Sequence, residues 1–379
     1  MSPDSGAELR IASAWEGREF RDFLELPYEI YRNDPNWVAP LKRDVRTMFD
    51  RSKHPFHQHS EVEPFVAYRA GRPVARIVAI HNRNHVEFHE EPVGFFGFFE
   101  CEDRQDTADR LFETVADWLR GRGLETMRGP ASFSTNEEAG LLVEGFDSPP
   151  VIMMPYNPPR YEALVEDAGF EKAKDLLALY LLQTEVPEFL IQREQRLAKR
   201  LKVRLRPIDM GEFDRELAIV RQIYNSAWEK NWGFVPMTES EIEFMAEELK
   251  PAVRRDPNQV IIAENERGEP IGFALWLLDF NQALIHANGR LFPFGLLKIL
   301  WNMRKISHVR VLTLGLIPEY RGMGIDHLLY LRIFRSAGEH GIYQGECSWV
   351  LEDNVSMTRP LERMGAYVDK RYRMYDRPL

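Results

Sequence analysis

The feature that most constrains the fold of this chain is that its second half repeats the order of patterns in its first half. Four landmarks recur: the start of the first strand, the end of the first helical pattern, the middle of a strand-turn-strand pattern, and the end of a late helix. They recur 193 to 196 residues apart, in the pairs Leu9 and Val203, Tyr31 and Tyr224, Ala67 and Ala263, and Gly169 and Gly365. Similarity at a fixed period indicates that one folding unit has been duplicated.

The length of 379 residues also favours two domains. A hydrophobic fraction of 44% is enough for each half to build its own core. Pro187 ends the last strand of the first half, and the charged run that follows has a helical pattern. We therefore predict a first domain over 1–186, a helical linker over 187–202 and a second domain over 203–379.

The composition argues against several classes of protein. A net charge of −10 argues against a nucleic-acid partner. Cys101 and Cys347 are the only cysteines, which indicates a reducing compartment and no cysteine-rich metal site. Residues 1–17 lack the apolar core of a secretory signal, and no stretch approaches the ~18 apolar residues of a membrane span. We expect a cytoplasmic protein, either free or peripheral at the inner face of the membrane.

Each half is predicted to be an α/β domain of the α+β type, with a mixed, mainly antiparallel sheet flanked by helices. In the second half, the patterns predict strands over 203–207, 260–264, 271–279, 310–317 and 367–375, and helices over 212–228, 239–250, 326–340 and 354–364.

The segment from Pro318 to Ile325 carries the clearest functional signal. A buried strand leads into a turn that contains Gly322 and Gly324, and a helix follows. Glycines let a backbone approach an anion closely, and the N–H groups at a helix start point toward it. Arg321 adds a cation to the turn. The pattern predicts a cradle for phosphate groups.

This segment resembles motif A of the GNAT acyltransferases. Arg321 and Gly324 match the first and fourth positions of that motif, and Leu316, Pro318 and Tyr320 match the approach to it. The resemblance implies that the turn binds the pyrophosphate of acyl-CoA, either acetyl-CoA or a long-chain acyl-CoA, and that the preceding strand binds the pantetheine arm. The implied cofactor-binding residues are Leu314, Leu316, Arg321, Gly322, Met323, Gly324, Ile325, Asp326 and Asn354.

The end of the chain resembles motif B of the same family, in which Asn354 begins a helix that ends at Gly365. A wider set of motifs resembles the GNAT-like proteins grouped with bacterial ceramide synthases, over nearly the whole chain. These motifs are Gly94 to Glu100, Arg128 to Pro130, Gly289 to Gly295 and Tyr320 to Asp326. Members of that group with a known function acylate a long-chain amino base with a fatty acyl-CoA.

Three positions depart from the GNAT pattern. Asp326 stands where motif A has Gly or Ala. Leu361 stands where many members place a Tyr that acts as the general acid. Strand 310–317 has no carboxylate, whereas many members place a Glu that acts as the base on this strand. The acid–base pair of the family therefore cannot be carried over. The resemblance to the ceramide synthase group would make Asp326 a feature of a subgroup.

Four other residues remain as acid–base candidates, namely Asp279, His286, Glu346 and Glu352. Asp279 follows a strongly apolar strand, where burial would raise its pKa toward that of a useful base. The alternative is an ordinary aspartate in a turn. His286 is equally well explained as a structural histidine.

An insertion over 289–305 separates two strands that GNAT domains usually join by a short turn. It combines large apolar residues with the cations Arg290, Lys298, Arg304 and Lys305. Such a composition is typical of a helix at a membrane interface. Two alternatives are a wall of a tunnel for an acyl chain and a helix packed on the first domain.

The first half lacks the glycine turn. Its equivalent turn, Glu100 to Asp106, has four carboxylates and no glycine, so we expect it to repel a pyrophosphate. His81, His85 and His89 recur every four residues, but the surrounding residues are typical of a strand or loop. The spacing alone does not predict convergent ligands, and we predict no metal.

These patterns together predict an acyl-CoA-dependent acyltransferase that acts on a primary amine, carried by a small molecule or a long-chain, sphingoid-type lipid. The alternative is a non-catalytic tandem GNAT module that binds a lipid or a protein partner. The sequence leaves the amine, the acyl length and the oligomeric state open.

Overall fold

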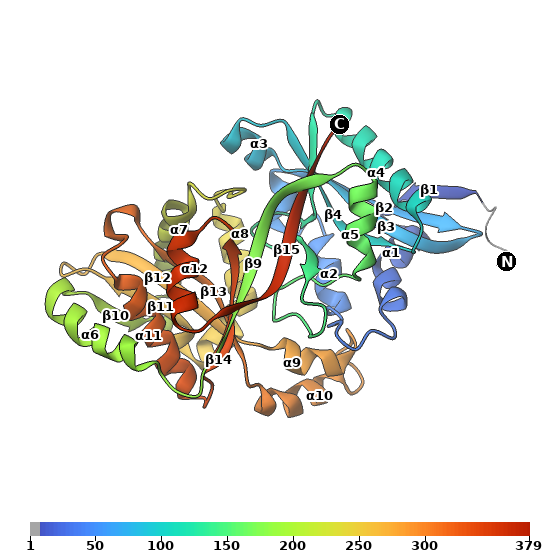
Figure 1. Ribbon diagram of the computed structural model, residues 1–379. Helices are drawn as coiled ribbons and strands as arrows, with labels where there is room; N and C mark the ends of the chain where they lie inside the picture. The colour runs from blue at the N-terminus through green and yellow to red at the C-terminus, as the bar shows by residue number, and fades with distance from the viewer. Residues whose placement is uncertain (1–7) are drawn as a thin grey trace. The chain divides into compact units, whose positions relative to one another are not determined.

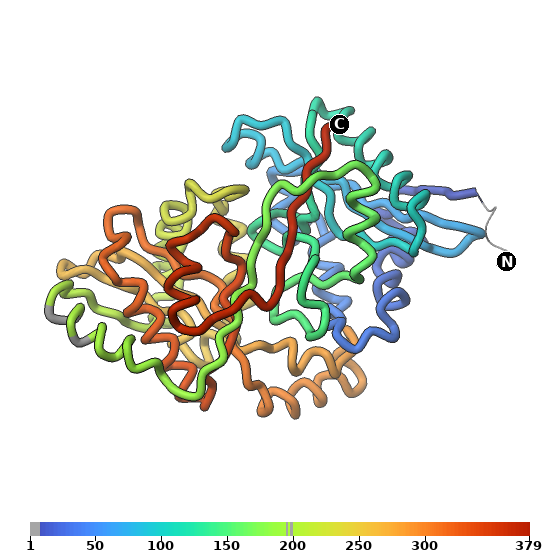
Figure 2. Tube along the Cα trace, in the orientation of Figure 1, coloured from blue at the N-terminus to red at the C-terminus, as the bar shows by residue number. Residues whose placement is uncertain are grey.

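The computed structural model describes residues 8–379, apart from the side chains of residues 195, 198 and 199, and the chain forms two compact units (Figures 1 and 2). Unit 1 comprises the described part of Met1–Leu176 together with Ala283–Trp301 and Lys370–Leu379, and unit 2 comprises Leu177–Gln282 and Asn302–Asp369. The sequence-based division at 187–202 treats each domain as one continuous stretch, whereas two later segments return to unit 1. The expectation that 1–17 holds no signal falls partly on residues 1–7, outside the described residues.

Unit 1 is built on strands in the order β1-β2-β3-β4-β5-β15. The first four are antiparallel, β4 and β5 are parallel, and β5 is antiparallel to β15. Its elements up to the crossing strand β9 are β1 (Leu9–Ser13), α1 (Gly17–Ile30), α2 (Lys42–Met48), β2 (Glu61–Arg69), β3 (Arg72–His81), α3 (Arg83–His89), β4 (Val93–Cys101), α4 (Gln105–Arg120), β5 (Thr126–Gly129), β6 (Ala131–Ser132), β7 (Glu138–Ala139), β8 (Leu141–Glu144), α5 (Arg160–Asp167) and β9 (Glu171–Leu182).

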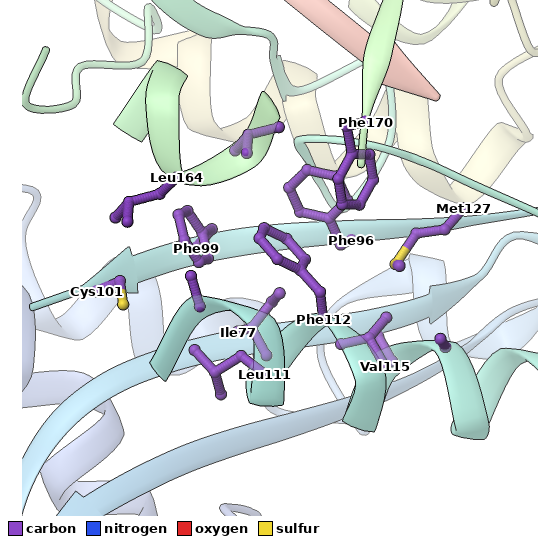
Figure 3. Close-up of a cluster of buried hydrophobic side chains, with 14 of the residues drawn as sticks. Ile77, Phe96, Phe99, Cys101, Leu111, Phe112, Val115, Met127, Leu164 and Phe170 are labelled. Carbon is purple, nitrogen blue, oxygen red and sulfur yellow. The ribbon is translucent and has the colours of Figure 1, made fainter. Parts of the chain in front are cut away.

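Helices cover both faces of the unit 1 sheet. Ile77 packs in a buried cluster with residues of α4 such as Phe112, which Figure 3 shows beside Phe96 and Phe99. The next side chain back along β3, Arg76, donates a hydrogen bond to the Phe23 carbonyl of α1 (3.0 Å). Because successive strand residues point to opposite faces, α4 and α1 lie on opposite sides of the sheet.

Unit 2 repeats this arrangement with strands in the order β10-β11-β12-β13-β14. The first four are antiparallel, and β13 and β14 are parallel. The remaining elements of the chain are α6 (Glu188–Leu201), β10 (Arg204–Pro207), α7 (Phe213–Trp228), α8 (Glu239–Arg255), β11 (Val260–Glu264), β12 (Pro270–Leu278), α9 (Asn281–Leu284), α10 (Gly295–Asn302), β13 (Val309–Leu316), α11 (Ile325–Gly338), β14 (Gln344–Leu351), α12 (Val355–Arg363) and β15 (Tyr367–Pro378).

The unit 2 sheet is also covered on both faces. Ile261 of β11 packs with Leu329 of α11, and its neighbour Ile262 packs with Ile223 of α7 and Val253 of α8. Strand order, pairing direction and helix placement thus recur in the two units. The predicted fold, two tandem copies of a mixed and mainly antiparallel sheet flanked by helices, is confirmed.

Two segments differ from their sequence-based descriptions. The residues around His85 form the helix α3 rather than a strand or loop, because the Asn82 side chain accepts a hydrogen bond from the His85 N–H and caps it (3.1 Å). The predicted linker is the helix α6, and it belongs to unit 2, where Leu190 and Leu197 are buried. None of the described helices is both long and apolar enough to cross a bilayer.

Candidate functional site

The site begins where two parallel strands of unit 2 part. β13 pairs with β14 only from Val309 to Val311 and then continues to Leu316 beside β12 alone. The Ile317 N–H donates to the Ile271 carbonyl of β12 (3.0 Å). Since backbone groups alternate along a strand, the N–H and C=O groups of Leu314 and Leu316 point away from β12, toward the side that β14 has left.

Two buried polar atoms lie on the diverging segments. Thr313 Oγ1 on β13 and Trp349 Nε1 on β14 both come after the last paired residues, and neither has a hydrogen-bond partner among the described residues. Buried polar groups are nearly always satisfied. These two atoms therefore fit a polar ligand that enters between the strands.

The turn after β13 contains two glycines and leads directly into α11. Gly322 and Gly324 have φ values of +71° and +95°, which favour glycine, and Gly324 is the N-cap of α11. An added Cβ at Gly322 would meet nothing within 4 Å. Among the described residues, no acceptor is found for the N–H groups from Gly322 to Asp326. A helix start of this kind suits an anion.

The Arg321 side chain fixes the shape of this turn. Its Nε donates to the Leu316 carbonyl (3.2 Å) and its Nη2 donates to the Ala227 carbonyl of α7 (2.6 Å). Arg321 is nevertheless exposed, so its charge stays at the mouth of the turn. Gly324 is buried against Leu197 of α6, whose side chain would lie 3.2 Å from an added Cβ. The predicted linker helix therefore supports the turn from behind.

Asp326 does not cap the helix, because Gly324 occupies that position. It lies in the first turn of α11, half-buried, with its Oδ1 3.1 Å from His327 Nδ1. A carboxylate here favours the helix dipole but repels an incoming phosphate.

Ionisable groups gather near the paired end of β13 and β14. Arg310 and Glu346 face each other in register, and the Arg310 guanidinium donates to the hydroxyl and the carbonyl of Ser348. Burial, the neighbouring Tyr367 and the charges of Asp369, Asp279 and Glu346 together raise the pKa of Tyr180 to about 12. These three carboxylates therefore act electrostatically on the Tyr180 phenol. We call Tyr180, Asp279, Glu346 and Asp369 the acidic cluster.

The acidic cluster has a buried floor and a partly exposed rim. Asp279 and Glu346 are 4% and 1% exposed, whereas Tyr180 and Asp369 are half-buried. The Tyr180 ring packs against Tyr367, which is 51% exposed. Burial lowers the pKa of His308, whose ring lies 5.6 Å from that of Tyr180. The half-buried Tyr180 and Asp369 are therefore the members of the cluster that solvent reaches.

Comparisons with known proteins identify the fold and the relatives of the chain. No family model matches the sequence. Protein YghO of Escherichia coli K12 is 36% identical over 368 residues, which cover 95% of this chain and 93% of that protein. The bacterial ceramide synthase of Caulobacter vibrioides is 34% identical over 383 residues, which cover 99% of both chains. The chain belongs to the bacterial ceramide synthase family.

Solved structures show the same tandem GNAT fold. A tandem GNAT protein from the clavulanic acid biosynthesis pathway superposes with a TM-score of 0.57 at 14% identity, over 98% of both chains. A GCN5-related N-acetyltransferase from Sphaerobacter thermophilus gives a TM-score of 0.54 at 14% identity, over 98% of this chain and 95% of the other. The predicted resemblance to tandem GNAT proteins and to bacterial ceramide synthases is confirmed.

Unit 1 also has two parallel strands that part, β4 and β5, but residues of unit 1 itself fill the space between them. β4 pairs with β5 only from Val93 to Phe95. Beyond that point, the Phe98 N–H donates to Ser132 Oγ (3.1 Å), and an added Cβ on Gly97 would lie 1.8 Å from the Ala131 carbonyl oxygen. The fully buried Phe133 packs among the rings of this region.

The turn before α4 is also closed from within. The buried Arg69 side chain donates hydrogen bonds to Glu102 (3.1 Å), Thr107 (2.8 Å) and Asp106 (3.2 Å). These contacts use the polar groups that a bound anion would need. Only in unit 2 do the described residues combine parted strands with an open glycine turn.

The predicted acid–base residues fall in different places. Asp279 closes the turn after β12, where its carboxylate accepts from the Asn281 N–H and the Gln282 side chain (both 3.2 Å). Glu352 follows β14 and is half-buried, and Asn354 precedes α12. His286 is exposed and belongs to unit 1, whereas Asp279 and Glu352 belong to unit 2.

Sequence reasoning missed Tyr180 altogether. This residue lies on β9, in a segment that the sequence assigns to the end of the first domain, but the structure places it in unit 2, where its hydroxyl donates to Gln344 of β14 (3.4 Å). The sequence contained one indication of this residue, because Tyr180 is a polar side chain between Leu179 and Leu181 in an otherwise apolar strand.

The described residues contain no group of three or more His, Cys, Asp or Glu side chains arranged to hold a metal ion. This applies to the three histidines around α3 as well. His85 and His89 share that helix with their rings 4.4 Å apart.

Proposed function

We propose that this protein transfers an acyl group from acyl-CoA to the primary amine of a long-chain, sphingoid-type lipid. The observation that carries the proposal is the open glycine turn at the start of α11, placed directly after the strand that parts from β14. The relationship to a bacterial ceramide synthase supports the lipid amine as acceptor.

In this proposal the backbone N–H groups from Gly322 to Asp326 bind the pyrophosphate of CoA, and Arg321 adds a positive charge. The pantetheine arm lies along the free edge of β13, where Leu314 offers its N–H and C=O groups. From the GNAT resemblance, Asn354 and Met323 are proposed to contact the same cofactor. Thr313 Oγ1 and Trp349 Nε1 supply further polar contacts for a ligand between the strands.

The acyl group is proposed to move in a single direct step. The amine nitrogen bonds to the thioester carbon, and the carbon–sulfur bond breaks. The amine loses a proton and the CoA thiolate gains one, so the products are the amide and free CoA. A covalent cysteine intermediate is disfavoured, because burial and the charge of Glu346 raise the pKa of Cys347 to about 12. A thiol that stays protonated is a poor nucleophile.

We propose the acidic cluster as the binding site for the ammonium form of the amine. Buried carboxylates attract a cation and can accept its proton. Asp279 and Glu346 are the proposed proton acceptors, and Tyr180 is the proposed donor. Glu352 and His286 remain predictions from the sequence.

Calorimetry with acetyl-CoA and palmitoyl-CoA tests the cofactor site, and thiol release across a panel of long-chain and short amines tests the chemistry. We expect binding of palmitoyl-CoA and turnover with a long-chain amino base. Absence of binding to both acyl-CoA molecules would overturn the proposal.

A non-catalytic module remains the second candidate, and one observation favours it. Leu361, which stands where many GNAT enzymes place a Tyr, is 1% exposed and packs in the core of unit 2. Binding of acyl-CoA without thiol release on any amine would favour this function.

A further inference from the structure

The insertion carries a dense group of exposed apolar side chains. Six of the thirteen large hydrophobic side chains that are exposed in the described part of the chain lie within ten consecutive residues. We call them the apolar patch, and they are Phe292 (78% exposed), Phe294 (65%), Leu296 (42%), Leu297 (63%), Leu300 (52%) and Trp301 (69%). Such a group on a protein surface marks an interaction site.

The patch is held in place by the start of the insertion. The Gly289 carbonyl accepts a hydrogen bond from the Lys42 N–H at the start of α2 (3.2 Å), and Gly289 lies against the Tyr28 ring. Gly295 is buried against the Arg290 carbonyl, which leaves no room for a Cβ. The segment therefore has an anchored side, and the apolar patch is its outer side.

The helix α10 divides along the same line. Leu296, Leu297, Leu300 and Trp301 follow the i, i+1, i+4, i+5 spacing that places side chains on one face of a helix. Ile299, on the other side of the helix, is only partly exposed. Lys298 is the one exposed polar side chain between Leu296 and Trp301 of this helix, so most of its exposed surface is apolar.

The charge around the patch identifies its partner. No Asp or Glu occurs between Asp279 and Glu319, although the whole protein has a net charge of −10. Within this acid-free stretch, three exposed cations flank the patch, namely Arg290, Arg304 and Lys305, and the exposed Lys298 lies within its range. Aromatic and leucine side chains with cations at their border match an anionic bilayer surface.

We propose that the apolar patch inserts into the interface of an anionic phospholipid bilayer, with α10 parallel to the membrane plane. The patch would then act as a reversible anchor, since no described helix can cross the bilayer. Membrane binding is independent of catalysis. Its use, which is access to a long-chain amine dissolved in the membrane, rests on the function proposed above.

Co-sedimentation with vesicles tests this anchor. The full-length protein is mixed with vesicles of phosphatidylcholine alone or with one fifth phosphatidylglycerol. We expect at least tenfold more protein on the anionic vesicles and a several-fold loss in high salt. Phe292→Ser combined with Phe294→Ser should reduce binding at least tenfold, and Lys298→Glu should reduce it several-fold.

A matched control separates the patch from general hydrophobicity. Leu182 is also exposed (62%), but it lies on β9 and not in the apolar patch. Leu182→Ser should therefore leave vesicle binding unchanged. The double variant should keep the wild-type melting temperature and its affinity for CoA. If the wild-type protein does not bind CoA, that result would contradict the proposed function but not the proposed membrane anchor.

Three results would overturn the anchor. The first is wild-type protein that does not bind anionic vesicles. The second is a double variant that binds them as well as wild type does. The third is a large drop in melting temperature or the dissociation of a dimer in the double variant, because the patch would then be covered by protein.

Discussion

Gly322 and Gly341 lie in turns at the two ends of α11 and have nearly the same positive φ, +71° and +72°. An added Cβ would meet nothing within 4 Å at either position. The two glycines therefore differ in location but not in the strain that a side chain would cause. Gly322 lies in the proposed phosphate cradle, and Gly341 lies at the far end of the helix.

Gly322→Ala should weaken CoA binding at least tenfold, because its methyl group stands where the pyrophosphate must approach the backbone. Gly341→Ala should leave the affinity unchanged. Both variants should lose about 1 kcal/mol of stability, the usual cost of alanine in the left-handed region. Calorimetry and thermal melting of both proteins measure the two effects. Equal CoA affinities for the two variants would contradict the assignment of the cradle.

Asp326→Asn should tighten CoA binding a few-fold. The carboxylate lies in the first turn of α11, where it repels the pyrophosphate, and the amide removes the charge while keeping the size of the side chain. The gain should shrink in high salt, because the ions screen this repulsion. Weaker binding by the variant would show that Asp326 helps to build the cradle.

Tyr180→Phe should lower kcat/KM at least tenfold without changing the melting temperature by more than a few degrees. The Tyr180 hydroxyl donates only one long hydrogen bond among those described, to Gln344 (3.4 Å), so its removal costs little stability. Since its pKa is raised to about 12, the phenol stays protonated at neutral pH and can act only as a donor. Initial rates of thiol release over a range of amine concentrations provide the measurement.

Tyr367→Phe is the matched control, since the Tyr367 ring lies 5.9 Å from that of Tyr180 but is exposed. It should retain nearly full activity. Equal losses in the two variants would point to a shared structural role instead of proton donation by Tyr180.

Most elements of unit 2 could be predicted from the sequence because each follows a local rule. The helix from Glu239 has a capping box with Thr238 and Glu241, and the strand from Val260 is bounded by turn residues. The glycine turn was visible for the same reason, since Gly322 and Gly324 adopt conformations that favour glycine. Local chemistry of this kind leaves a signature in a single sequence.

The parts that could not be predicted depend on distant contacts. The opposition of Arg310 and Glu346 is a matter of strand register between segments 36 residues apart. The return of 283–301 and 370–379 to unit 1 follows from packing, which leaves no local pattern. Arg321 was expected to face the ligand, yet its guanidinium donates hydrogen bonds to two backbone carbonyls. The positions of these carbonyls cannot be predicted from the sequence.

The stability of unit 1 should depend on the protonation of His85. This side chain is 1% exposed, and neither ring nitrogen has a hydrogen-bond partner among the described residues. Its ring packs on Phe95, and the Glu91 carboxylate lies 4.0 Å from Nε2, beyond hydrogen-bonding distance. Burial, with help from His89 and Arg128, lowers the pKa of His85 from 6.5 to about 3.

The sign of the effect follows from this lowered pKa. Between about pH 6.5 and pH 3 the unfolded chain binds a proton at His85 that the folded chain does not, so stability is full above pH 6.5 and falls as the pH drops. His85→Leu should abolish this contribution, and wild type should lose about 1–2 kcal/mol more than the variant between pH 7.5 and pH 5. Denaturant unfolding at the two pH values measures the difference. A variant as acid-sensitive as wild type would contradict the lowered pKa of His85 in the folded protein.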